Sequence, residues 1–212
     1  MKKFLSGIII IISMVLVSSI IGQVYEKNTS KKQVEDISNK LIRFHILANS
    51  DSIEDQELKL RVKDEVLNFI QPILKESKSL DESRDILRNN NEKIIEIANE
   101  VVKKNGYDYK VNAELSRENF PVKVYGDIAL PQGEYEAYRI LIGDAEGENW
   151  WCVMFPPLCF VDVTKGEVNS EETKKELSRV LDDNEMDTVS KEKKVKVKFK
   201  FLEVIEDLIN KK

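Results

Sequence analysis

The chain has 212 residues, enough for one compact domain with terminal extensions. Hydrophobic residues make up 42% and charged residues 33%, so a core can form while long polar segments stay outside it. The formal net charge of −5 argues against the clustered basic surface of nucleic-acid-binding domains, and we expect no nucleic-acid partner.

The amino terminus carries an export signal. Lys2 and Lys3 precede an almost unbroken apolar run over residues 4–21. This run of about 18 residues exceeds a typical secretory core and reaches the lower limit for a membrane-spanning helix. Residues 1–22 are therefore either a signal peptide or a membrane anchor, and both place the rest of the chain outside the cytoplasm. Residues 23–40 are polar and indicate a spacer or a frayed helix.

The first strand is predicted over residues 41–48. Ile42, Phe44 and Ile46 alternate with Arg43 and His45, which is the period of a half-buried strand.

Two amphipathic helices are predicted next. The first begins with Asp51 as its N-cap and Glu54 three residues later, and Pro72 should end or kink it. The second begins at Ser79 in another capping-box pattern and stops at Gly106, which can adopt a left-handed conformation.

Strands follow these helices. Residues 107–115 alternate without fault, and the runs at 122–125 and 135–142 are separated by Gly and Pro, which favours an antiparallel meander. The most apolar stretch after the leader is residues 150–160, which should enter the core or form a binding surface. We therefore predict an α+β fold in which an N-terminal strand and a helical pair pack on a mostly antiparallel sheet.

The domain is expected to span residues 41–165. Residues 166–194 are rich in charge and poor in apolar anchors, which predicts a charged linker. Residues 195–212 form an amphipathic C-terminal segment, in which a short terminal helix can be preceded by a strand.

His45 is the only histidine, and no G-x-S-x-G motif supplies a serine partner for it. Its ordinary role would be that of an exposed or hydrogen-bonded strand residue, with a partner contact or a catalytic role as the alternatives. With one His and two Cys, the usual zinc ligand sets are missing. We assign no catalytic residue, no metal site and no cofactor, and we expect no small-molecule substrate.

Cys152 and Cys159 are the only cysteines, and the Pro156-Pro157 pair between them bends the chain. Outside the cytoplasm such a pair favours a disulfide. The alternative is two buried free thiols, because Cys packs well as a small hydrophobic residue.

Trp150 and Trp151 are adjacent and should point to opposite faces of a strand. Either both are buried, or one of them anchors a partner, since tryptophan is enriched at interface hot spots.

Several sequence blocks resemble the stage II sporulation protein R family, over residues 41–161. They are RFHILANSDS at residues 43–52 with DQ at 55–56, LK at 58–59 and VKD at 62–64, then FPVKVYG at 120–126, LPQGEY at 130–135 and GENWWCVMFPPLCF at 147–160.

The resemblance implies a protein made in the forespore of an endospore former and exported into the space between forespore and mother cell. There it would trigger a membrane-embedded aspartic protease of the mother cell, which removes the pro-sequence of a mother-cell sigma factor. This role implies intercellular signalling and no reaction catalysed by the chain itself.

Contact residues can only be inferred from expected exposure, and His45, Asn49, Asp51 and Trp150 are the candidates. Two other hypotheses stay open. One is an exported hydrolase that acts on cell-wall polymer, with acidic residues near His45 for acid–base chemistry. The other is a membrane-associated scaffold whose C-terminal tail lies on anionic lipid.

Overall fold

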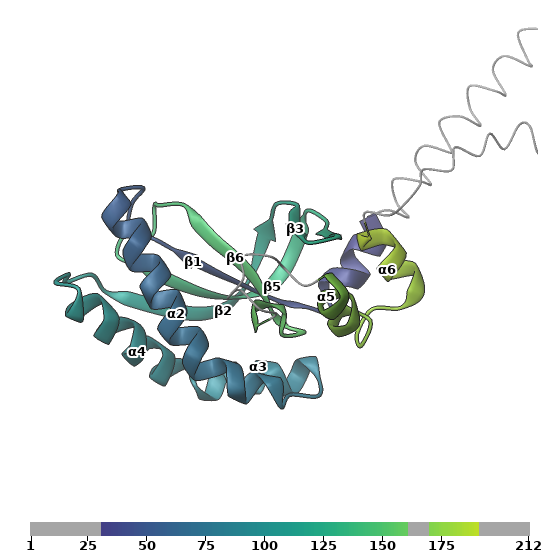
Figure 1. Cartoon of the computed structure of the whole chain (residues 1–212), viewed down its shortest axis with the longest axis horizontal. Coiled ribbons are helices and arrows are strands. Elements are labelled where there is room, and N and C mark those ends of the chain that lie inside the picture. Colours follow the sequence, from purple (N-terminus) through teal and green to yellow (C-terminus); the bar gives the residue numbers. More distant parts are fainter. Residues whose placement is uncertain (1–30, 161–169, 191–212) are drawn as a thin grey trace, which may run out of the picture.

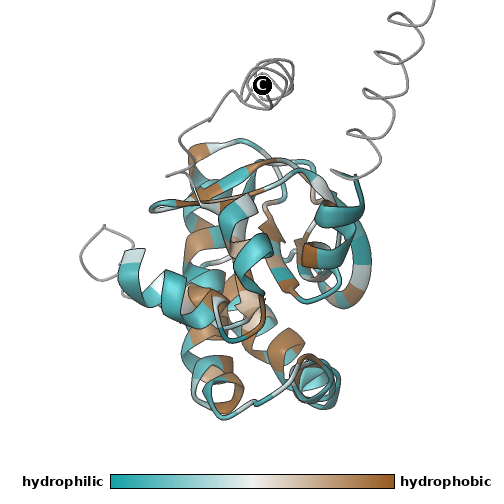
Figure 2. Ribbon diagram, turned by 90° about the vertical axis from the view of Figure 1, so that its right-hand side faces the viewer, coloured by the Kyte–Doolittle hydropathy of each residue, from teal (hydrophilic) through white to brown (hydrophobic). Residues whose placement is uncertain are grey.

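A computed structural model of the chain describes residues 31–160 and 170–190, which form the predicted α+β fold around a four-stranded sheet. Three helices cover one face of the sheet, and a hairpin with short helices covers part of the other (Figure 1, Figure 2). Within these residues no helix is long and apolar enough to cross a membrane. Residues 1–22 and 195–212, for which we predicted an export segment and an amphipathic segment, lie outside the described residues.

The sheet has the order β2 (Val111–Phe120), β5 (Gly133–Ile142), β1 (Ile42–Leu47) and β6 (Asn149–Phe155). β2 with β5 and β1 with β6 are antiparallel, whereas β1 and β5 are parallel, so the sheet is mixed. Since β1 lies between two strands and packs on both faces, it is almost completely buried instead of half-buried.

The helical layer consists of α2 (Ile53–Lys75), α3 (Leu80–Asn89) and α4 (Asn91–Lys104). α2 and α4 pack together, and α4 also contacts β2. Between this layer and the sheet lies the larger core, in which Phe44, Val62, Ile70, Leu87, Ala98 and Ile140 are buried.

The ends of α2 differ from the prediction. Ser52, not Asp51, is the N-cap, because its hydroxyl accepts the Asp55 backbone N–H at 3.2 Å. Pro72 does not end the helix, which continues to Lys75. A proline in the last turn removes a single backbone hydrogen bond, and the buried Leu74 beyond it holds this turn on the core.

The second predicted helix is in fact two helices. Ser79 caps α3 by accepting the Glu82 backbone N–H, and Gly106 ends α4 with a φ of +83°, both as expected. The break lies at Asn90, which leaves helical geometry with a ψ of 5°. Its side-chain amide donates to the Ile86 carbonyl at 2.8 Å, and this local bond competes with the helix.

The predicted meander does not form. β3 (Lys123–Tyr125) pairs with β4 (Ile128–Leu130) in a separate two-stranded sheet, and β2 pairs directly with β5. β2 also begins later than predicted, at Val111.

A smaller core lies on the opposite face of the sheet and changes two predicted boundaries. Residues 31–38 of the predicted spacer are helical, and Ile37 is fully buried. Residues 170–190 of the predicted linker form α5 (Ser170–Leu177) and α6 (Asp183–Val189), which contact β4. Leu177 and Val189 are fully buried in this core, so the folded unit extends beyond residue 165.

Candidate binding surface

The loop that follows β1 is locked to the loop between β5 and β6. The Ala48 carbonyl accepts the Gly147 backbone N–H at 3.0 Å, and the Asn49 carbonyl accepts the Glu146 backbone N–H at 3.3 Å. Because β1 and β5 are parallel neighbours, the loops after both strands lie at the same end of the sheet.

The predicted contact residues Asn49 and Asp51 join these two loops. The side-chain carbonyl of Asn49 accepts the Asp144 backbone N–H at 3.0 Å, while its amide donates to Asp55 Oδ2 at 2.9 Å. The Asp51 carboxylate accepts the Glu148 backbone N–H at 2.6 Å. Asn49 is half-buried and Asp51 is exposed, so Asp51 is the more accessible of the two.

Asp55 lies beneath the loops, and its ionisation depends on them. Burial alone raises the pKa of its carboxyl, but the hydrogen bonds from Ser50, Asn49, Tyr109 and Ser52 outweigh burial and lower the pKa below its ordinary value. The Ser50 hydroxyl, for example, donates to Asp55 at 2.6 Å. Asp55 is therefore a charged, buried anchor of the loop that follows β1.

Lys59, one turn further along α2, holds the other loop. Its ammonium donates to the Glu148 carbonyl at 2.7 Å and also to Gln56. Burial lowers the pKa of Lys59. Gln56 in turn donates to the Ser50 carbonyl at 3.0 Å, so one helical turn fastens both loops.

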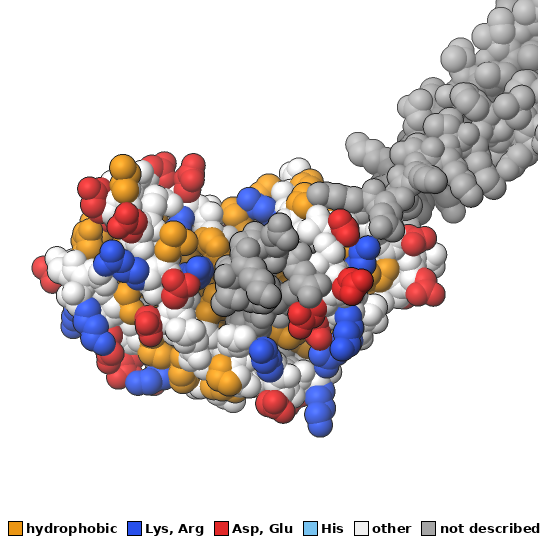
Figure 3. Space-filling model, in the orientation of Figure 1, with side chains coloured by type: hydrophobic (Ala, Val, Ile, Leu, Met, Phe, Trp, Pro, Cys, Tyr) orange, Lys and Arg blue, Asp and Glu red, His pale blue; other side chains and the backbone are white. Residues whose placement is uncertain are grey.

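Close backbone approach requires glycine here. A Cβ on Gly147 would overlap the Ser50 carbonyl, and one on Gly143 would overlap the Asn49 side chain. Around these loops the side chains of Asp51, Glu54, Asp144, Glu146 and Glu148 are exposed. Figure 3 shows the resulting group of acidic side chains at the upper left, where α2 begins.

His45 is buried on the face of the sheet opposite the helices, with 4% of its surface exposed. Its ring stacks on Trp151 at a centroid distance of 5.0 Å, and its Nδ1 lies 3.1 Å from the Asn149 side-chain oxygen. Burial lowers the pKa of His45 to about 4, although the hydrogen bond to Asn149 opposes this shift. His45 is therefore a neutral, hydrogen-bonded strand residue whose side chain does not reach the surface, and we no longer place it among the contact residues.

Arg43 lies two residues before His45 on the same face and is fully buried among aromatic rings. Its guanidinium carbon lies 4.5 Å from the Phe120 ring centroid and 4.9 Å from that of Tyr135, and Nη2 donates to the Tyr125 hydroxyl at 3.2 Å. Within the described residues, no carboxylate pairs with it, and its Nε and Nη1 have no hydrogen-bond partner. Sequence reasoning did not find this cluster, because its four members come from β1, β2, β3 and β5.

Trp150 and Trp151 lie on opposite faces of β6, as the strand period predicts, and both are half-buried. Trp150 packs edge-on against Phe44, and the Lys63 ammonium lies 5.3 Å from its ring centroid. On the other face, the Lys123 ammonium lies 5.0 Å from the centroid of Trp151.

Cys152 and Cys159 are joined in a disulfide with a Cα–Cα distance of 5.6 Å, and both are buried. The bridge ties β6 to η1 (Leu158–Phe160), the short 3₁₀ helix that follows it.

These features together define an α+β domain in which polar residues hold loops and strands in place, and aromatic side chains border one edge of the sheet. The profile of the family described as Stage II sporulation protein R matches residues 38–165. Stage II sporulation protein R of Bacillus subtilis (strain 168) is 36% identical over 218 aligned positions, which cover 96% of this chain and 97% of that protein. No solved structure gives a significant match.

The chain belongs to the stage II sporulation protein R family. A role in sporulation follows from this membership.

Proposed function

We propose that the protein is an exported sporulation signal that activates a membrane-embedded aspartic protease of the mother cell, which then removes the pro-sequence of a mother-cell sigma factor. The observation that carries the proposal is the family match, since the similarity to the Bacillus subtilis relative covers almost the whole of both chains.

Two features support a location outside the cytoplasm, in the space between forespore and mother cell. Residues 4–21 form an apolar run behind Lys2 and Lys3, which suits export or anchoring in the forespore membrane. The disulfide between Cys152 and Cys159 suits an oxidising compartment.

The proposed action is docking. A ligand shifts an equilibrium only by the difference in its affinity for the two states, so the domain must bind the active arrangement of the protease more tightly than the inactive one. The locked loops after β1 and β5 favour such a role, because a surface that is ordered before binding loses little entropy on docking.

Within the described residues, the geometry around His45 and Asp51 gives no support to the hydrolase hypothesis. His45, on which the hydrolase hypothesis depended, is buried and neutral, and Asp51 is occupied by the Glu148 backbone N–H. A general base must reach the proton that it abstracts, and His45 does not reach the surface. The lipid-bound tail of the scaffold hypothesis lies outside the described residues.

Deletion of the gene in its host tests the proposal. We expect the sigma-factor precursor to accumulate on immunoblots during sporulation, and the full chain to restore processing. A chain without residues 1–22 should fail to restore it, because it stays in the forespore cytoplasm. Normal processing in the deletion strain would contradict the proposal.

A binding experiment tests the mechanism. The purified full chain should bind the active arrangement of the protease at least tenfold more tightly than the inactive one. Equal affinity for both would refute activation by docking, even if deletion blocks processing.

A further inference from the structure

As far as the structure describes the chain, the last strand of the sheet has an open outer edge. In the order β2-β5-β1-β6 the described residues place no strand beyond β6. Within the same residues, the backbones of Asn149, Trp150 and Trp151 make no hydrogen bond to any segment except β1. In an edge strand, every second residue directs its N–H and C=O groups away from the sheet.

The open part of β6 is short and well defined. Cys152, Val153, Met154 and Phe155 are buried, and η1 packs back against the strand. Asn149, Trp150 and Trp151 are half-buried. The accessible backbone therefore belongs to these three residues, which we call the tryptophan edge.

The tryptophan edge lacks the usual protection against pairing. Exposed edges are normally blunted by charged residues, proline or bulges. β2, at the opposite side of the sheet, carries Glu114, Arg117 and Glu118, whereas β6 contains no charged residue. The only irregularity in the pairing of β6 lies where its partner passes from Ile42 to Arg43, within its buried part.

Each face of the tryptophan edge presents one tryptophan and one lysine. Lys63 lies over Trp150 and is already paired with Asp64 at 2.8 Å. Lys123 lies over Trp151, and no carboxylate of the described residues pairs with it. A strand added to β6 would therefore pass beside an uncompensated positive charge on the Trp151 face.

We propose that the tryptophan edge pairs with an extended strand of the partner protein that carries carboxylate side chains. The added strand completes the backbone hydrogen bonds of β6, its apolar side chains pack on the two tryptophans, and a carboxylate pairs with Lys123. This inference rests on the proposed function, for which it names the docking surface.

At Lys123, charge argues against two other occupants. The carboxyl-terminal residues 194–200 alternate lysine with valine or phenylalanine, so their addition would bring further positive charge to Lys123. Pairing with a second copy through the same edge would bring Lys123 of both copies to one interface.

A charge-exchange experiment tests the proposal in vitro. The probes are two seven-residue peptides that alternate valine with glutamate or with lysine, titrated into the purified full chain. We expect the acidic peptide to bind at least tenfold more tightly, and to slow exchange of those amides of the tryptophan edge that point away from β1. Lys123→Glu should invert the preference, whereas Lys103→Gln, an exposed lysine on α4, should leave it unchanged.

Several results of this experiment would refute pairing at the tryptophan edge, and each identifies a different cause. Equal binding of the two peptides, or protection elsewhere, overturns the proposal. Amide protection of the tryptophan edge in the absence of peptide also overturns the proposal. If this protection increases with protein concentration, the occupant is a second copy. If it disappears on deletion of residues 194–212, the occupant is the tail.

In sporulating cells, Lys123→Glu should reduce processing of the precursor about tenfold, at an unchanged level and melting temperature of the protein. If deletion of the gene blocks processing while the Lys123→Glu variant supports it normally, the proposed function is retained and docking at the tryptophan edge is refuted. If deletion of the gene does not affect processing, both the proposed function and the docking proposal are refuted.

Discussion

The side chains of β1 point alternately into the two cores of the molecule. Ile42, Phe44 and Ile46 enter the larger core, whereas Arg43 and His45 enter the smaller, aromatic one. A buried cation without a carboxylate is costly, but contact with several desolvated rings stabilises it by about 2 kcal/mol or more. The polar side of β1 is therefore stabilised by aromatic rings instead of water, which strand periodicity alone does not reveal.

The buried His45 should make stability depend on pH. Its pKa is about 4 in the folded protein and 6.5 ordinarily, so the unfolded chain binds the additional proton between these values. The contribution of neutral His45 to the free energy of unfolding is therefore fully present above pH 6.5. As the pH decreases toward 4, this contribution falls by up to about 3 kcal/mol. Urea unfolding at several pH values should show this slope, and His45→Gln should flatten it. An equal slope in the variant would assign the effect to other groups.

Gly147 should be indispensable for the locked loops. In Gly147→Ala the added methyl group overlaps the Ser50 carbonyl, and separating the loops should lower the free energy of unfolding by at least about 2 kcal/mol. Ala145→Gly is the matched control in the same loop. Ala145 has a φ of +56°, so relief of strain offsets the entropic cost of glycine, and we expect a change below about 1 kcal/mol. Similar melting temperatures for the two variants would contradict this account.

Among the elements, those with a regular local pattern could be predicted and those defined by distant contacts could not. β1, the start of α3 and the stop at Gly106 follow from periodicity and capping residues, whereas the predicted N-cap of α2 is wrong by one residue. The pairing of β3 with β4 and the parallel β1–β5 pair depend on contacts far apart in the chain. Helices α5 and α6 are mostly charged, and a few buried residues such as Leu177 hold them.

The candidate site shows the same division. Adjacent tryptophans on a strand predict two faces, and the bend at Pro156-Pro157 together with the expected export favours a bridge between Cys152 and Cys159. Asn49 and Asp51 were singled out as partner contacts, yet their hydrogen bonds join two loops about 95 residues apart. No local pattern in the sequence indicates a bond over this separation.

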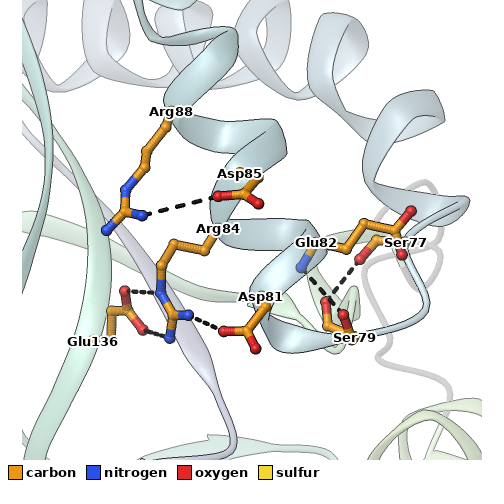
Figure 4. A network of polar contacts seen from close by, with 8 residues as sticks. All are labelled: Ser77, Ser79, Asp81, Glu82, Arg84, Asp85, Arg88 and Glu136. Carbon is orange, nitrogen blue, oxygen red and sulfur yellow. Dashed lines mark hydrogen bonds and ion pairs between the residues drawn. The ribbon is translucent and has the colours of Figure 1, made fainter.

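Besides the apolar packing of Leu87, an ion pair joins helix α3 to the sheet. Arg84 Nε and Nη2 donate to the two carboxylate oxygens of Glu136 on β5, each at 2.8 Å, and both side chains are largely buried (Figure 4). Arg84→Met should leave the Glu136 carboxylate unpaired and cost about 1–3 kcal/mol in thermal unfolding. Arg88→Met removes an exposed pair with Asp85 on the same helix and should cost less than about 0.5 kcal/mol. Equal losses of stability in the two variants would show that the pair with Glu136 stabilises the fold no more than the exposed pair does.

For the molecule as a whole, the two cores imply that the carboxyl-terminal helices contribute to stability. Leu177→Ala should lower the free energy of unfolding by about 2–4 kcal/mol, because it leaves a cavity in the smaller core. Ser178→Ala, at an exposed neighbouring position, should have little effect. If denaturant unfolding shows no difference between the two variants, α5 belongs to a linker after all.

The position of β1 at the centre of the sheet also has a consequence for the order of assembly. β1 is the first strand among the described residues, but its neighbours β5 and β6 follow only after about 90 residues or more. A chain that crosses a membrane with its amino end first therefore cannot close the sheet until most of the domain has emerged. If the protein is exported as proposed, the same topology that buries β1 delays folding while the chain passes through the export channel.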